Sequence, residues 1–193
     1  MLTNTTAAGF MGSYKKGRAG FCDDIALVIG GSLVIALSAQ VAVLLPFSPV
    51  PFTLQTFAVL MIGALLGPWR AALSVLTYIM QGAAGLPVFA LGRAGFAVLL
   101  GPTGGYLLGF IAAAYITGLL AERGWDRRIA TTILAMALGN AAVYPFALLW
   151  LCCLTGINST VLIVGLYPFI VGDLLKVVLA AVFSHRAERC LGR

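Results

Sequence analysis

Two charged residues of opposite sign stand three positions apart in an apolar stretch near the end of the chain. Asp173 and Lys176 are surrounded there mainly by aliphatic residues. On a helix this spacing puts both side chains on one face, where they can pair or offer an adjacent acceptor and donor to a bound molecule. A charge inside a membrane span costs at least about 2.5–3.5 kcal/mol and usually has a function. We interpret the pair as ligand-binding, the alternative being an ion pair that joins neighbouring helices.

Arg93 is a further candidate for contact with a ligand. It lies in a stretch rich in glycine, between two strongly apolar segments. The planar guanidinium group can hold a carboxylate through two parallel hydrogen bonds. The alternative is an arginine that faces water or lipid headgroups.

Uncharged polar side chains also fall inside the apolar segments. They are Gln40, Gln55, Thr77, Tyr78, Gln81, Asn140 and Tyr144. Most such groups join membrane helices through hydrogen bonds. Gln55 and Gln81 are the better ligand candidates because they fall near the outward ends of their predicted helices, where both can face one vestibule.

The sequence carries no motif of a known catalytic or nucleotide-binding centre. It has no Gly-x-Ser-x-Gly, no His-Glu-x-x-His and no Walker-type phosphate loop, and its four cysteines lack the spacing of metal ligands. The chain is therefore predicted not to be an enzyme, to bind no metal or cofactor, and to hydrolyse no ATP. Its chemistry must consist of capturing or moving a molecule.

The composition is that of an integral membrane protein. Of 193 residues, 61% are hydrophobic and 9% are charged, and the mean hydropathy is +1.04. Soluble domains have about 25% charged residues. Apolar runs of about 20 residues without a two-residue alternation favour spanning helices over barrel strands.

The pattern predicts an all-α fold, a bundle of six transmembrane helices. A polar, basic leader is expected at residues 1–24, the transmembrane domain at 25–184 and a basic tail at 185–193. The helices are expected at residues 25–45, 52–66, 70–84, 106–121, 129–154 and 168–183. Residues 85–105, between the third and fourth helices, are rich in glycine yet apolar, and are predicted to form a long outer loop that packs on the bundle.

The cations lie overwhelmingly on one side of this predicted bundle. Those assigned to the one side are Lys15, Lys16, Arg18, Arg70, Arg123, Arg127, Arg128, Arg186, Arg189 and Arg193. Only Arg93 falls in an opposite loop, while Lys176 lies within the last helix. This asymmetry predicts a multi-pass protein with both termini in the cytoplasm, and it explains the positive charge by contact with membrane lipid, without a nucleic-acid partner.

Small residues recur at four-residue spacing along the first helix, as in the pair Ser32 and Ala36. Such pairs let another helix approach closely, and we take this one as a candidate interface with a partner protein.

Five sequence blocks together resemble the BioY family, the biotin-specific substrate-binding (S) components of energy-coupling factor transporters. The blocks are PVPFTLQT (49–56), GALLGP (63–68), GLPVF (85–89), GPTGGYLLGF (101–110) and DLLK (173–176). The block at 101–110 is the most specific, and the likeness extends from about residue 49 to residue 180.

The resemblance implies a vitamin-uptake function in the cell (inner) membrane of a bacterium. It implies six helices, capture of biotin as the transported ligand from the outer face, and association with a transmembrane coupling protein and ATPase subunits. It also implies a pocket that includes Asp173 and Lys176, with Arg93 and Gln81 as further candidates. The alternative is a self-sufficient secondary transporter or facilitator for biotin or a similar small carboxylate, in which Asp173 would carry a proton.

Overall fold

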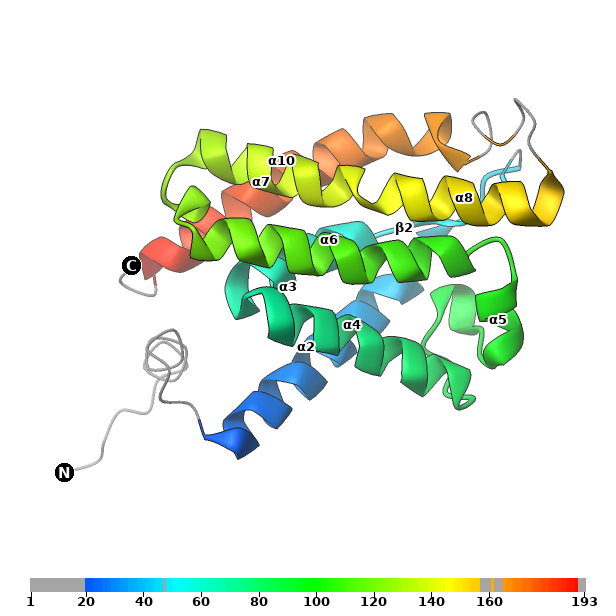
Figure 1. Cartoon of the computed structure of the whole chain (residues 1–193), viewed down its shortest axis with the longest axis horizontal. Helices are drawn as coiled ribbons and strands as arrows, with labels where there is room; N and C mark the ends of the chain where they lie inside the picture. The colour runs from blue at the N-terminus through cyan, green and yellow to red at the C-terminus, as the bar shows by residue number, and fades with distance from the viewer. Residues whose placement is uncertain (1–19, 47, 157–160, 162–164, 191–193) are drawn as a thin grey trace.

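The computed structural model describes residues 20–46, 48–156, 161 and 165–190 as a largely helical bundle (Figure 1). Its elements in chain order are α2 (Phe21–Gln40), β1 (Ala42–Val43), β2 (Phe52–Thr53), α3 (Gln55–Leu66), α4 (Pro68–Ala83), η1 (Ala90–Gly92), α5 (Phe96–Leu100), α6 (Gly104–Glu122), η2 (Trp125–Arg127), α7 (Ile129–Ala141), α8 (Val143–Thr155) and α10 (Tyr167–Cys190). Among these residues the predicted predominance of helix is confirmed, and the exception is one short pair of strands.

Four helical stretches within the described residues are long and apolar enough to cross a membrane. They are Phe21–Gln40, Gly104–Glu122, Ile129–Thr155 and Tyr167–Ser184. A span requires about 20 residues because the hydrocarbon layer is about 30 Å thick. α3 and α4 are shorter, at 12 and 16 residues. The protein is therefore a membrane protein with several apolar helices.

Helix α6 is the most deeply buried of these four stretches and packs against α3, α4, α7 and α8. Glycine permits the close contacts. A Cβ atom added at Gly118 would lie 2.5 Å from the backbone nitrogen of Pro68, and one at Gly109 would lie 2.8 Å from the carbonyl oxygen of Val143. Gly67, with φ of +80°, ends α3, and Pro68 begins α4, which is the boundary that these two residues predict.

The first connection corrects two predicted helix boundaries. Helix α2 ends at Gln40 rather than at residue 45, and α3 begins at Gln55 rather than at residue 52. The residues between them form an antiparallel pair of strands, β1 and β2, extended by a hydrogen bond from the Leu54 amide to the Val41 carbonyl (3.1 Å). Prolines at 46, 49 and 51 exclude a helix through this segment because each lacks an amide donor.

The fifth predicted helix is divided in the structure. Helices α7 and α8 meet at Ala142 within a single apolar stretch of 27 residues. Pro145 is the physical reason, because a proline ring conflicts with the carbonyl four residues earlier and removes one helical hydrogen bond.

The last helix is longer than predicted. α10 continues to Cys190, so that most of the basic tail expected at residues 185–193 is helical. This tail contains Arg186, Ala187, Glu188 and Arg189, which are good helix formers, and a change from apolar to charged residues marks the edge of a membrane rather than the end of a helix.

Residues 85–103, most of the predicted glycine-rich loop, connect α4 to α6 and contain two short helical turns, η1 and α5. The segment packs on the bundle through Phe89, which is 2% exposed. The Phe89 ring lies edge-on to Tyr78, with 5.6 Å between ring centroids. It occupies space that the missing side chain of Gly82 leaves open, since a Cβ atom there would lie 2.2 Å from the ring.

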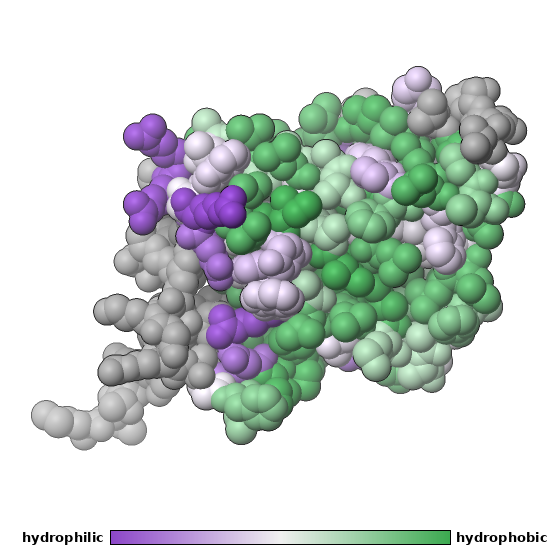
Figure 2. All heavy atoms as spheres, in the orientation of Figure 1, coloured by the Kyte–Doolittle hydropathy of each residue, from purple (hydrophilic) through white to green (hydrophobic). Residues whose placement is uncertain are grey.

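The hydrophilic side chains gather at one end of the molecule, the end at which α2 begins and α10 finishes (Figures 1 and 2). The exposed arginines of this end include Arg123, Arg127 and Arg128. The rest of the visible surface is dominated by apolar residues (Figure 2). Large apolar side chains are exposed on the molecule, among them Leu37 (71%) and Leu149 (67%). Apolar side chains so exposed on the sides of a bundle are stable in lipid.

Candidate ligand-binding site

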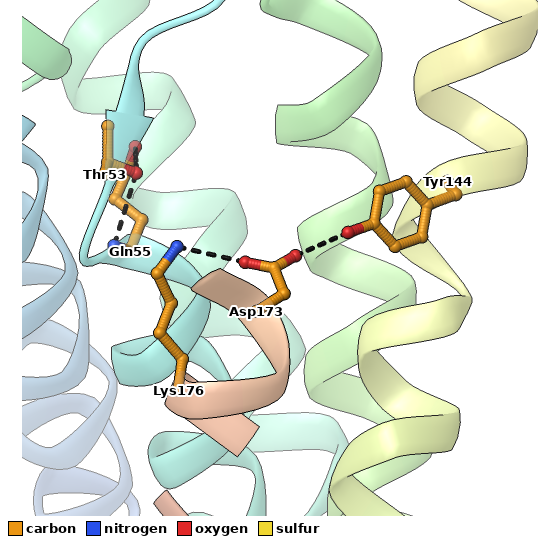
Figure 3. Close-up of polar contacts among 5 residues, drawn as sticks. All are labelled: Thr53, Gln55, Tyr144, Asp173 and Lys176. Carbon is orange, nitrogen blue, oxygen red and sulfur yellow. Dashed lines mark hydrogen bonds and ion pairs between the residues drawn. The ribbon is translucent and has the colours of Figure 1, made fainter. Parts of the chain in front are cut away.

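The Asp173–Lys176 pair is buried in the second and third turns of α10. Lys176 Nζ donates to Asp173 Oδ1 at 3.0 Å, and the lysine and aspartate side chains are 6% and 8% exposed. Tyr144, on α8, donates from its hydroxyl group to the other carboxylate oxygen, Oδ2, at 2.6 Å. Asp173 thus lies between Lys176 and Tyr144, as Figure 3 shows. The spacing-based prediction that both charges share one helix face is confirmed.

An aromatic ring covers the lysine. Lys176 Nζ lies 3.7 Å from the centre of the Phe52 ring, a distance at which an ammonium group is attracted to the ring face. Phe52 comes from β2 and stacks on Phe169 of α10, with 6.2 Å between ring centroids. Its ring enters the space beside Gly172, where an added Cβ atom would lie 2.2 Å from Cζ. The strand pair thus brings an aromatic residue to the buried charge.

The pair lines a cavity whose wall is mainly apolar and aromatic. The polar residues of that wall are Thr53, Gln55, Thr56, Tyr78, Arg93, Thr103, Tyr106, Tyr144, Asp173 and Lys176. They come from β2, α3, α4, α6, α8, α10 and the segment between α4 and α6. An apolar cavity with a few oriented polar groups is the usual form of a small-molecule site.

Gln55 reaches the cavity as predicted, and its amide group is held in one orientation. Its Nε2 atom donates to the Tyr78 hydroxyl at 2.8 Å, and its Oε1 atom accepts from the Thr53 hydroxyl at 3.2 Å. Gln55 is 4% exposed. The structure therefore brings Gln55 into the same cavity as Asp173 and Lys176.

Arg93 also lines the cavity, but from a different depth. Its side chain is exposed, whereas Asp173 and Lys176 are buried. The guanidinium group belongs to the segment between α4 and α6, just after η1. The cavity thus has a buried pair of opposite charges and a cation at its exposed edge.

Gln81 and the Ser32/Ala36 pair lie outside this cavity. Gln81 Nε2 donates to Ser32 Oγ at 3.3 Å and joins α4 to α2. Ser32 is fully buried and Ala36 is 8% exposed. The contact of Ser32 and Ala36 with a partner protein stays a prediction, and within this chain the pair is buried, with Ser32 bonded to Gln81 of α4.

Tyrosines are the site residues that sequence reasoning undervalued. Sequence alone favours helix contacts for Tyr78 and Tyr144 without excluding a ligand, and it does not single out Tyr106. In the structure each lines the cavity, and Tyr144 binds the carboxylate directly. The one available signal was the presence of a polar group in an apolar segment, which is the same for a helix contact and for a ligand contact.

The arrangement suits binding rather than bond-breaking chemistry. Within the part of the chain that the structure describes, no cluster of three or more His, Cys, Asp or Glu side chains could hold a metal ion. The buried wall supplies a carboxylate acceptor, an ammonium donor and an oriented amide next to aromatic surface. This set of groups is complementary to a compact, partly apolar molecule that carries both donors and acceptors.

Comparison with known proteins identifies the family. A family model described as the BioY family matches residues 8–193. The chain belongs to the BioY family. Two BioY relatives, each named biotin transporter BioY, illustrate the similarity. The protein from Rhizobium etli is 35% identical over 84% of this chain and 91% of its own length, and that from Thermotoga maritima is 38% identical over 81% and 90%.

A solved structure agrees with the BioY assignment. It is described as the S-component for biotin from an ECF-type ABC transporter, and it superimposes with a TM-score of 0.77 at 28% sequence identity. The match covers 87% of this chain and 92% of that structure. The BioY resemblance predicted from the five sequence blocks is confirmed, and the relatives are named transporters rather than enzymes.

Proposed function

We propose that this protein is the biotin-binding S component of an energy-coupling factor transporter and serves in biotin uptake. The observation that carries the proposal is the buried Asp173–Lys176 pair facing an aromatic cavity in a member of the BioY family. Partner ATPases supply the energy, since the chain has no Walker-type phosphate loop. A transmembrane coupling protein connects the two.

The chemistry of biotin matches the distribution of polar groups along the cavity. Its ureido ring offers two N–H donors and one carbonyl acceptor, for which Asp173 and Lys176 supply the acceptor and the donor. Placing the ligand carboxylate beside Asp173 would bring two negative charges together, which is unfavourable. The ureido ring therefore occupies the buried end, the carboxylate meets Arg93 at the exposed edge, and Gln55 lies near the ring.

The proposed membrane arrangement has six transmembrane helical segments. α7 and α8 form one of them, and the shorter α3 and α4 each account for one, beside α2, α6 and α10. Arginine-rich turns at the end where α10 finishes then face the cytoplasm, with both termini on that side, as the positive-inside rule requires. The segment between α4 and α6 is the outer loop over the cavity, and the membrane is the bacterial inner membrane.

Equilibrium binding of labelled biotin to the detergent-purified full chain tests the proposal. Wild type is expected to bind biotin tightly and to reject pantothenate and thiamine. Asp173→Asn and Lys176→Met should each weaken binding by about a hundredfold or more, because a buried donor or acceptor loses its partner.

The Asp24–Arg70 pair offers a matched control. It joins α2 to α4 at the charged end with a 2.9 Å separation, away from the residues that line the cavity. Asp24→Asn should therefore leave biotin affinity within about twofold of wild type. A folded wild-type protein without biotin binding would overturn the proposal. Uptake by liposomes that contain this chain without ATPases would favour the self-sufficient transporter instead.

A further inference from the structure

Gln40, the last residue of α2, binds a turn that lies nearly 50 residues away in the sequence. Its Nε2 atom donates to the carbonyl oxygens of Val88 and Phe89, each at 3.2 Å, and its Oε1 atom accepts from the Gly92 amide at 3.1 Å. One side chain thus serves two acceptors and one donor of what we call the 88–92 turn. A side-chain amide carries two N–H donors and one carbonyl acceptor, so this single group can serve all three partners.

The 88–92 turn has a strained backbone. Leu91 has φ of 63° and ψ of 28°, the left-handed region that a residue with a branched side chain rarely adopts, and Gly92 follows with φ of 68°. Such a conformation persists when surrounding contacts hold it in place. Two contacts from outside the turn help to hold it, the buried Phe89 ring beside Gly82 and the hydrogen bonds of Gln40. They act beside a bond within the turn, from the Gly92 amide to the Phe89 carbonyl at 3.1 Å.

The same turn forms part of the cavity wall. Phe89 and Ala90 line the cavity, and Arg93, directly after the turn, lines it as well. The Arg93 carbonyl oxygen accepts from the Phe89 amide at 3.1 Å, so a change in the turn also moves the backbone that carries the guanidinium group. The neighbouring residue of Gln40, Val41, binds the Leu54 amide near β2. The end of α2 therefore holds two of the segments that enclose the cavity.

We propose that Gln40 is a positioning residue, which latches the 88–92 turn over the cavity and thereby sets how quickly a bound ligand leaves. The identity of that ligand rests on the proposed function. The latch itself is a feature of the empty protein and does not depend on that function. Breaking it releases the strain at Leu91 and opens the exposed edge of the cavity. The buried Asp173–Lys176 pair keeps its own contacts.

Hydrogen–deuterium exchange of the unliganded full chain tests the latch by itself. Gln40→Leu keeps the size of the side chain and removes its donors and acceptor. Peptides that cover residues 86–95 should exchange about tenfold faster than in wild type, because the Gly92 amide opens more often. The matched control is Ser38→Ala. Ser38 lies two residues before Gln40, and its hydroxyl donates to the Ile35 carbonyl within α2. Equal exchange in wild type and Gln40→Leu would overturn the proposal.

Ligand kinetics then test the consequence. In Gln40→Leu the dissociation rate of labelled biotin should rise about tenfold, equivalent to about 1.4 kcal/mol, while the melting temperature of the empty protein stays close to that of Ser38→Ala. An unchanged dissociation rate, or a fall in melting temperature that accounts for the faster release, contradicts the latch. Absence of biotin binding in wild type contradicts the proposed function instead, and the exchange result still decides the latch.

Discussion

Two pairs of opposite charges, one lining the cavity and one joining α2 to α4, differ in burial rather than in separation. Asp173–Lys176 and Asp24–Arg70 have nearly equal separations, 3.0 Å and 2.9 Å. The side chains of the first pair are 8% and 6% exposed, and those of the second are 39% and 28% exposed. Distance alone therefore does not distinguish a binding site from a surface contact. Burying the Asp173–Lys176 pair costs desolvation free energy, and apolar residues in its place would be as stable or more so. The face of α10 that carries the pair lines a cavity.

The surroundings of the two pairs also differ, being aromatic around the buried pair and hydrophilic around the exposed one. Asp173 and Lys176 have aromatic neighbours, Tyr144 at the carboxylate and Phe52 over the ammonium group. Asp24, which pairs with Arg70, is in the first turn of α2, the helix that begins at the hydrophilic end of the molecule (Figures 1 and 2). Water and salt can reach that end, whereas the cavity wall excludes most of both. The two pairs should therefore respond differently to substitution.

The largest expected difference is in stability. Asp173→Asn leaves the Lys176 charge buried without its partner, and the free energy of unfolding in detergent should fall by about 3 kcal/mol or more. Asp24→Asn should lower it by about 1 kcal/mol or less. The double variant Asp173→Asn/Lys176→Met should recover part of the loss because no lone charge stays buried. Equal losses for the two aspartates would remove the distinction between the pairs.

A smaller effect is expected from the residue that admits the aromatic ring. Gly172→Ala places a methyl group where the Phe52 ring now lies, 2.2 Å from Cζ. Displacing the ring from Lys176 should weaken biotin binding by about tenfold, measured by titration with labelled biotin. Gly30→Ala is the matched control, because an added Cβ atom there meets nothing within 4 Å. Unchanged affinity in Gly172→Ala would show that Phe52 does not set the geometry of the buried pair.

The smallest expected effect is the response to salt. Raising ionic strength from about 0.1 M to about 1 M shortens the screening length from about 10 Å to about 3 Å. The stability difference between wild type and Asp24→Asn should shrink, while that between wild type and Asp173→Asn should stay nearly constant. Salt-dependent unfolding in detergent measures both. A strong salt dependence at Asp173 would mean that water reaches the buried pair.

Local sequence pattern was sufficient to predict the membrane helices, the shared face of the charged pair and the family. The length of its apolar runs predicts membrane helices, and the spacing of Asp173 and Lys176 predicts their shared face, because both depend only on the geometry of one helix. The five sequence blocks were also sufficient to indicate the BioY family. Pro145 could have predicted the break between α7 and α8, since its effect is equally local.

Only the tertiary structure decided what each polar side chain binds. Gln55 and Gln81 have the same chemistry and similar predicted positions, yet Gln55 lines the cavity and Gln81 binds Ser32. Gln40, for which a contact between helices is the favoured expectation, instead binds the 88–92 turn. The physical reason is that these partners are distant in sequence and come within hydrogen-bonding distance through the packing of several helices. The sequence by itself determined which groups must find partners inside the membrane, and the fold determined which partners they found.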